Sequence, residues 1–202
     1  KSYLKERAKL IDRKRTVDAK FGTPRGGTVY LTTADASGMM VSYIQSNYQG
    51  FGSGVVVPGT GISMQNRAIG FVLADGHVNQ VGPRKRPFHT IIPAFMTKAG
   101  QPVMGFGVMG GFMQAQGHLQ MAIRLVDYAQ NPQSMIDAPR WRVEGGSSLN
   151  IEEAMPADSI AALQKLGHPI VIADRFSTDL GRAQIIMKTD GGYIGASEWR
   201  TD

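Results

Sequence analysis

The pattern of hydrophobic and polar positions divides the chain into β-rich ends and a helical centre. Near the N-terminal end, runs rich in β-branched and aromatic residues predict strands over 28–33 and 39–45, and the turn Asp35-Ala36-Ser37-Gly38 joins them as a hairpin. A second strand pair is expected around the turn at 99–102, and two late strands precede a turn at 190–192. These further strands are predicted over 87–98, 103–108, 170–173 and 184–188.

Helical spacing appears in the middle of the chain and again nearer its end. The longest predicted helix covers 113–130 and has an apolar face made of Leu119, Ala122, Ile123 and Val126. Shorter helices are expected over 132–138, over 156–166, where Gly167 ends the helix, and around residues 3–11. Helices packed on sheets would bury the apolar side chains of these predicted elements, so we expect an α+β fold.

Charge is distributed unevenly along the chain. Nine basic and three acidic residues precede Thr28, a net charge of +6 that equals the net charge of the whole chain. The net charge of residues 28–202 is therefore zero, and the high isoelectric point of the chain comes from the first segment only. Because no aromatic interleaving or base-reading motif accompanies the basic residues, we expect no nucleic-acid partner. The charge pattern predicts a basic tail over 1–27 and one globular domain over 28–202.

Several kinds of chemistry are excluded by composition. The chain has no cysteine, so a disulfide framework and thiolate chemistry are absent. We expect neither a metal nor another cofactor, because the spacing of the four histidines, His77, His89, His118 and His168, matches no metal-binding motif. No apolar stretch is long enough to span a bilayer, and the sequence leaves open whether the protein is cytoplasmic or exported.

The junction of Gly27 and Thr28 suggests a nucleophile that the protein frees by cutting itself. A threonine hydroxyl needs an adjacent base, and the α-amine of a chain that begins with Thr28 could supply it, with a pKa near ~7.7–8.0. The same hydroxyl could first attack the Gly27 carbonyl, since glycine tolerates the strained backbone that this attack requires. The alternative is that Thr28 is only a β-branched residue at the start of a strand.

A glycine-rich run, Gly105-Phe106-Gly107-Val108-Met109-Gly110, formally matches a dinucleotide-binding fingerprint. We reject this match because the nearest acidic candidate, Asp127, falls within the following helix instead of at the end of the next strand. The pair Gly110-Gly111 at a helix N-terminus would offer free N–H groups and a positive dipole end, as an oxyanion hole requires. A tight strand-to-helix turn explains the same pair equally well.

A colinear set of motifs from Thr28 to the C-terminal end resembles the small subunit of the γ-glutamyltranspeptidase family. The resemblance implies an N-terminal-nucleophile hydrolase with a four-layer αββα sandwich, in which autoproteolysis separates a large from a small subunit. Residues 1–27 would be the end of the large-subunit region, and residues 28–202 the small-subunit catalytic domain. The motifs are the runs 27–35, 46–54, 82–87, 110–111, 131–140 and 195–197.

The resemblance also implies roles for individual residues. Thr28 would be the nucleophile, with its freed amine as the base, and Ser46 would hydrogen-bond the nucleophile where the family commonly has a threonine. Gly110 and Gly111 match the pair whose N–H groups stabilise the tetrahedral oxyanion.

Substrate-binding positions match the family less closely. His89 and Thr90 stand where a serine pair contacts the α-carboxylate of the substrate, and Tyr48 replaces an asparagine. The family holds the glutamyl ammonium with a Gln and an Asp, where this chain has Arg67 and Gly70. An ammonium near Arg67 would be disfavoured without a carboxylate, so an acyl group that has a carboxylate but lacks the ammonium fits better.

Three hypotheses follow from the resemblance. The chain belongs to an autoprocessed enzyme that cleaves γ-glutamyl amide bonds of the glutathione type, transferring the acyl group to water or an amine. Alternatively, it belongs to an amidohydrolase of the glutaryl or cephalosporin acylase kind, or to a homologue in which Thr28 is never freed. The implied partners are a large subunit from the same precursor and a small acyl substrate, with a higher oligomer possible.

Overall fold

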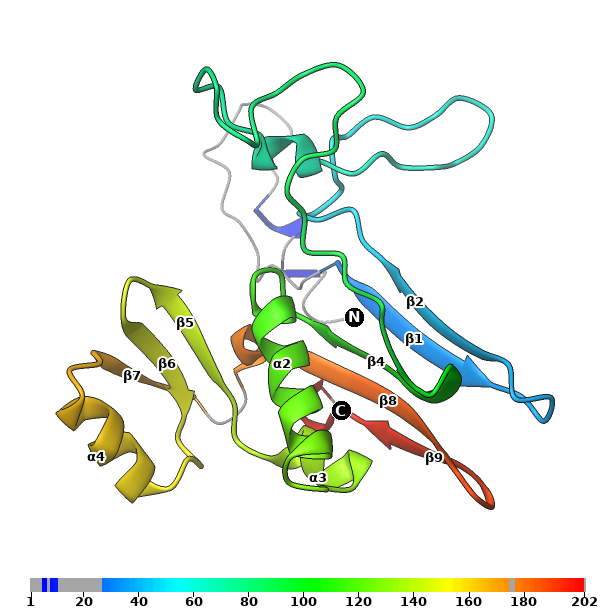
Figure 1. Ribbon diagram of the computed structural model, residues 1–202. Coiled ribbons are helices and arrows are strands. Elements are labelled where there is room, and N and C mark those ends of the chain that lie inside the picture. Colours follow the sequence, from blue (N-terminus) through cyan, green and yellow to red (C-terminus); the bar gives the residue numbers. More distant parts are fainter. Residues whose placement is uncertain (1–4, 7, 11–26, 175–176, 202) are drawn as a thin grey trace.

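A computed structural model describes residues 5–6, 8–10, 27–174 and 177–201, and these residues form three sheets with helices beside them (Figure 1). The first sheet is an antiparallel hairpin of β1 (Val29–Ala34) and β2 (Met40–Gln45). The second is a four-stranded antiparallel sheet in the order β3-β4-β8-β9. Its strands are Ala94–Lys98, Gln101–Met109, Arg182–Thr189 and Gly192–Ser197.

The four-stranded sheet is the middle layer of the main body. The β1-β2 hairpin packs on one of its faces, while α2 (Met113–Val126) and α3 (Pro132–Asp137) cover the other (Figure 1). Helix, sheet and hairpin therefore form three successive layers of an α+β sandwich.

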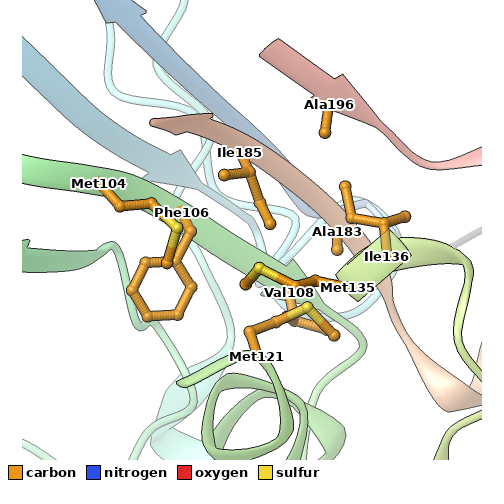
Figure 2. Packing of buried hydrophobic residues seen from close by; sticks show 9 residues of the cluster. All are labelled: Met104, Phe106, Val108, Met121, Met135, Ile136, Ala183, Ile185 and Ala196. Atoms are coloured by element: carbon orange, nitrogen blue, oxygen red, sulfur yellow. The ribbon is translucent and has the colours of Figure 1, made fainter. Parts of the chain in front are cut away.

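The main hydrophobic core lies between the sheet and its helices (Figure 2). Its side chains come from the two central strands, from β9 and from α2 and α3, and most of them are fully buried. They are Met104, Phe106, Val108, Met121, Met135, Ile136, Ala183, Ile185 and Ala196. Met121 of α2 and Met135 of α3 both lie in this cluster, so the core holds the two helices on the same face.

Glycines set how closely the layers approach. A Cβ added to Gly107 would lie 2.4 Å from the Tyr30 ring, and one added to Gly105 would lie 2.5 Å from Thr32 Oγ1. On the helix side, a Cβ at Gly117 would lie 2.6 Å from Val108 Cγ1. The glycines of the rejected dinucleotide fingerprint therefore have a packing role: they let the hairpin lie directly on β4.

A smaller sheet lies beside the main body, with α4 (Ala157–Lys165) packed near it (Figure 1). Its strands run in the order β5 (Trp141–Gly145), β6 (Ser148–Glu152) and β7 (Ile170–Ala173). The pair β6-β7 is parallel, with α4 between the two strands in the sequence. Short 3₁₀ turns cover Arg67–Gly70, Thr178–Leu180 and Trp199–Thr201.

Most predicted elements are confirmed, including the first hairpin, β4, β7, β8, α3 and α4. The strand expected over 87–98 is shorter, because the N–H groups of Phe88 and Ile92 donate to the side chains of Asn79 and Gln114 rather than to another strand. Strands β5, β6 and β9 were not predicted. Of the helix expected around residues 3–11, residues 5, 6 and 8 are helical, while residues 3, 4, 7 and 11 lie outside the described residues.

The predicted apolar face of α2 was wrong. Leu119, Ile123 and Val126 are between 37% and 68% exposed, whereas Met113, Gly117 and Met121 are buried together with the polar Gln114, His118 and Gln120. The sequence pattern misleads here because the buried side of the helix contains a glycine and polar residues, each of which has at least one side-chain atom hydrogen-bonded to the backbone. The helix also ends at Val126 instead of continuing to residue 130. Ala129, which lies beyond this end, has a φ of 49°, which is not helical.

Candidate active site

Thr28 and Ser46 lie opposite each other at the open end of the first hairpin. Register pairs Val29 with Gln45, which brings the residue before β1 next to the residue after β2. Thr28 Oγ1 donates a hydrogen bond of 3.0 Å to Ser46 Oγ. The structure thus brings together the proposed nucleophile and the hydroxyl proposed to orient it, 18 residues apart in the sequence.

Ser46 Oγ accepts a second hydrogen bond, from the backbone N–H of Tyr48 at 2.8 Å. Tyr48 has a φ of 75°, a left-handed conformation that is uncommon for a residue with a side chain. The φ of Tyr48 sets the direction of its side chain relative to the preceding chain, and the ring lies against Arg67. The Arg67 guanidinium carbon lies 4.9 Å from the centroid of that ring.

Arg67 is a buried cation without an acidic partner among the described residues. Its side chain is 8% exposed, and Nη1 donates to Thr90 Oγ1 at 3.4 Å. Burial lowers the pKa of Arg67, opposed only by its interaction with Tyr48. A buried guanidinium with unused donors is suited to bind a carboxylate in a bidentate manner.

The predicted substrate-binding residues line one small cavity of about 30 Å³. Its wall contains Tyr48, Arg67, Gly70, Phe88, His89, Thr90 and Phe112. Phe88 and Phe112 stack with their centroids 6.1 Å apart and form an aromatic side of this cavity. His89 is exposed, and its Nδ1 accepts from the backbone N–H of Ile91 at 3.2 Å.

Gly110 and Gly111 form the turn between β4 and α2, with φ values of 136° and 59°. Their carbonyls accept from Met113 N at 3.1 Å and from Gln114 N at 3.0 Å. Neither glycine N–H has an acceptor among the described residues. The turn is thus a candidate anion-binding site at the start of a helix.

Packing of the hairpin on β4 brings this turn toward Thr28. Thr32 lies over Gly105 and Tyr30 lies over Gly107, so each step of two residues along β1 matches a step of two along β4. Extended by one more step, this register directs Thr28 toward Met109, the last residue of β4 and the neighbour of Gly110 in the sequence. One end of the layered fold therefore gathers Thr28, Ser46, the glycine turn and the Arg67 cavity.

A buried ion network behind the glycine turn was missed from the sequence. Arg140 Nη2 lies 2.6 Å from Glu198 Oε2, and Arg200 contacts both Glu198 Oε1 and Glu152 Oε1 at 2.6 Å. All four side chains are at most 5% exposed. The sequence signals only that charged residues, Arg140 and Glu198, directly follow Ala138-Pro139 and Gly195-Ala196-Ser197; it does not show that the two pair.

The pKa shifts in this network show how its charges are held. Burial opposes ionisation of Glu198, but Arg140 and Arg200 lower its pKa below the ordinary value. Burial also acts against Arg200, but hydrogen bonds to Glu152 and Glu198 raise its pKa. For Arg124 nearby, burial and the cations Arg140 and Arg200 lower the pKa to about 10.

Two features of the described residues bear on other functions. In that part of the chain, no group of three or more His, Asp or Glu side chains is placed to hold a metal ion. No helix there is both long and apolar enough to cross a membrane.

The sandwich of sheet, hairpin and helices, with a threonine at the start of the first strand, defines the class of N-terminal-nucleophile hydrolase folds. All 202 residues match the family model described as Gamma-glutamyltranspeptidase. The chain belongs to the γ-glutamyltranspeptidase family.

Individual relatives come from more than one branch of this family. A solved structure of a cephalosporin acylase from Bacillus halodurans superposes with a TM-score of 0.81 and 49% identity, covering 100% of this chain and 37% of that chain. A glutathione hydrolase-like proenzyme of Bacillus subtilis, YwrD, is 37% identical, over 87% of this chain and 34% of the relative. An oxamate amidohydrolase proenzyme of Klebsiella pneumoniae is also 37% identical, over 90% of this chain and 35% of the relative. The chain thus spans about a third of the length of these relatives.

Proposed function

We propose that this chain carries the catalytic centre of an N-terminal-threonine amidohydrolase that becomes active by cleavage between Gly27 and Thr28. The observation that carries the proposal is the 3.0 Å hydrogen bond from Thr28 Oγ1 to Ser46 Oγ. In this bond a second hydroxyl meets Thr28, the threonine that follows Gly26-Gly27 and immediately precedes the first strand. The relatives named as proenzymes support activation by processing.

Processing would begin when Thr28 Oγ attacks the Gly27 carbonyl carbon. The resulting intermediate collapses by breaking the bond between Gly27 and the Thr28 nitrogen, which leaves an ester to Thr28 Oγ and a free α-amine. Water then hydrolyses this ester, and Gly27 ends the first segment with a carboxylate. In the intact chain the Thr28 nitrogen is an amide and cannot act as a base, so Ser46 is the neighbouring group that orients the hydroxyl.

Turnover would use the freed amine. The α-amine of Thr28 accepts the hydroxyl proton while Oγ attacks the substrate amide carbon, and the N–H groups of Gly110 and Gly111 stabilise the oxyanion. The proton passes to the leaving amine as the C–N bond breaks, giving an acyl ester on Thr28. Water or a second amine attacks this ester and releases the acyl group.

The domain division and the partner belong to the same proposal. Residues 1–27 would be the end of a large subunit made from the same precursor, and residues 28–202 the small-subunit catalytic domain. The share of the relatives that this chain spans, about a third, fits a small subunit that works with the rest of the precursor. Assembly into a higher oligomer is also proposed.

The acyl donor is proposed to be a γ-glutamyl amide of the glutathione type, as in relatives named glutathione hydrolases. One observation favours a second candidate, an amidohydrolase that takes glutaryl-like acyl groups. Arg67 is buried beside Thr90, and the described residues that line this cavity include no carboxylate to hold a substrate ammonium. A terminal carboxylate on the acyl group would pair with Arg67, and the relative named a cephalosporin acylase supports this branch.

Mass spectrometry of the complete protein tests the proposal first. We expect a fragment that begins at Thr28 in the wild type and none in Thr28→Ala. Cleavage that persists in Thr28→Ala would identify another nucleophile. An uncleaved wild type would instead support the third hypothesis, a homologue in which Thr28 stays blocked.

Paired substrates distinguish the two acyl donors. The processed protein is incubated with γ-glutamyl anilide and with glutaryl anilide, which differ by the α-amine. A higher kcat/KM for the glutaryl compound would favour the second candidate, and a higher value for the γ-glutamyl compound would favour the first. Equal kcat/KM values for the two anilides would contradict the argument that Arg67 favours an acyl group without the α-amine.

A further inference from the structure

Gly181 lies where three parts of the main body meet. It follows the 3₁₀ turn Thr178–Leu180, precedes β8 and has a φ of 87°. A Cβ at this position would lie 2.7 Å from Val108 Cγ1 and 2.9 Å from the Met109 carbonyl oxygen. A side chain is therefore excluded twice, by the backbone conformation and by the closeness of the end of β4.

The same glycine lies directly against the proposed oxyanion turn. A Cβ on Gly110 would lie 3.1 Å from the Cα of Gly181 and 3.2 Å from the Cβ of Met113, at the start of α2. The two glycine backbones are thus in close contact, with no side chain between them. Any displacement of Gly181 toward β4 has to move Met109 or Gly110.

On its other side, Gly181 is held by the buried ion network. Arg140 Nη1 donates to the Gly181 carbonyl at 2.7 Å and to the Leu180 carbonyl at 3.3 Å. Arg140 is completely buried, and Glu198 fixes its guanidinium through Nη2 at 2.6 Å. A carbonyl held by a buried, paired guanidinium has little freedom to move.

We propose that Gly181 is a positioning residue for catalysis. Its backbone packs against Gly110 and thereby holds the N–H groups of Gly110 and Gly111 in place. The inference rests on the proposed function of these two glycines. Gly181 transmits the rigid position of Arg140 to the turn through direct backbone contact. Oxyanion donors must be aligned closely, since a misplacement of about 1 Å can reduce a rate about 100-fold.

The test separates packing from positioning with two substitutions. Gly181→Ala alone introduces close contacts with Val108 Cγ1, with the Met109 carbonyl and, at 3.2 Å, with Met113 Cγ. Combining it with Val108→Ala removes the contact with Val108 Cγ1 but keeps those with the Met109 carbonyl and with the flexible Met113 side chain. Val108→Ala alone is the reference for the double variant. Gly167→Ala is the matched control, because Gly167 has a φ of 90° but no atom within 4 Å of the added Cβ.

All variants are made in the complete protein, and Tm, cleavage at Gly27-Thr28, kcat and KM for the preferred anilide are measured. We expect the double variant to have a kcat about 10- to 100-fold below that of Val108→Ala, with KM within about twofold. Gly167→Ala should retain the wild-type kcat.

A kcat equal to that of Val108→Ala would overturn the proposal. It would also be overturned by a double variant that does not fold or is not cleaved, because Gly181 is assigned to the turnover step. If the wild type itself is cleaved but hydrolyses neither anilide, the proposed function fails instead, which the control measurements on wild type reveal separately.

Discussion

The ring of Tyr30 lies directly on the backbone of Gly107, so closely that a Cβ on the glycine would be 2.4 Å from the ring. Tyr30 is 5% exposed, and its hydroxyl is hydrogen-bonded with Ser42 Oγ at 2.8 Å. Ser42 in turn donates to the Ala94 carbonyl at 2.8 Å. This contact joins the hairpin to the sheet and thereby fixes the position of Thr28 relative to the end of β4.

Gly107→Ala should separate these two layers. Because the methyl group overlaps the Tyr30 ring, we expect a loss of about 1–3 kcal/mol in the free energy of unfolding, measured by urea denaturation. Gly195→Ala, in β9 of the same sheet, is the control, because nothing lies within 4 Å of its added Cβ. Similar losses in both variants would mean that the close approach of Tyr30 to Gly107 is not what limits the substitution.

Ser46→Ala should slow both processing and turnover, because it removes the acceptor of the Thr28 hydrogen bond. A contribution from one positioned proton-transfer partner is typically about 10²–10⁴-fold, and orientation alone should account for the lower part of that range. The measurements are the rate of cleavage at Gly27-Thr28 and kcat for an anilide.

Ser46→Thr is the control for this prediction. It keeps a hydroxyl that can accept from Thr28 and from the Tyr48 N–H, so most of the activity should remain. Full activity in Ser46→Ala would show that Thr28 needs no hydroxyl partner at this position.

Local chemistry in the sequence was sufficient to predict much of the fold. The first hairpin has a turn whose Asp35 carboxylate accepts from Ser37 N at 2.8 Å, and α3 begins with Asn131 accepting from Ser134 N at 3.0 Å. Such caps and turns depend on neighbours in the sequence and can be recognised there. Strand β9 was missed because Gly192 and Gly195 weaken the β signal, whereas pairing with β8 determines the strand.

The candidate site divides in the same way. Thr28 and the pair Gly110-Gly111 could be predicted, because a hydroxyl after glycine and a glycine pair before a helix have recognisable chemistry. Gly181 could not, since its importance comes from a contact with Gly110, about 70 residues away in the sequence. The partners of Arg140 could not be predicted either, because Glu198 is brought to it only by the packing of β9 and α3.

Arg67→Gln should weaken binding of an acyl group that carries a terminal carboxylate. A hydrogen bond to a charged group contributes about 1.5–3 kcal/mol, so KM for glutaryl anilide should rise about 10- to 100-fold with a smaller change in kcat. Steady-state kinetics of the processed protein provide the measurement.

Lys98→Gln is a charge-matched control, because it removes a cation on the exposed end of β3. It should leave KM unchanged. An Arg67→Gln variant with the wild-type KM would exclude Arg67 from carboxylate binding.

Glu198→Gln should destabilise the fold strongly, because it leaves Arg140 buried beside a neutral amide. Breaking a buried ion pair typically costs about 3–5 kcal/mol. The comparison is Glu144→Gln, which breaks a partly exposed pair with Arg142 at 3.1 Å and should cost less than about 1 kcal/mol. Equal losses in thermal or urea unfolding would contradict the importance assigned to the buried network.

His118 is a buried histidine whose surroundings disfavour the charged form. It is 8% exposed and lies against Phe106, with ring centroids 5.4 Å apart. Its Nδ1 is hydrogen-bonded to the Gln114 carbonyl. Burial lowers the pKa of His118 below the ordinary value of 6.5, and interactions with the backbone of Gln114 and of Ile92 oppose this shift only in part.

This shift predicts that the protein loses stability as the pH falls below about 6.5. In that range the unfolded chain takes up a proton at His118 while the folded chain does not, so protonation favours unfolding down to the lowered pKa. The slope from this one group is at most about 1.4 kcal/mol per pH unit. Urea unfolding between pH 5.5 and 7.5 should show a shallower slope in His118→Gln, whereas His77→Gln, at an exposed histidine, should retain the wild-type slope. An unchanged slope in His118→Gln would assign the pH dependence to other groups.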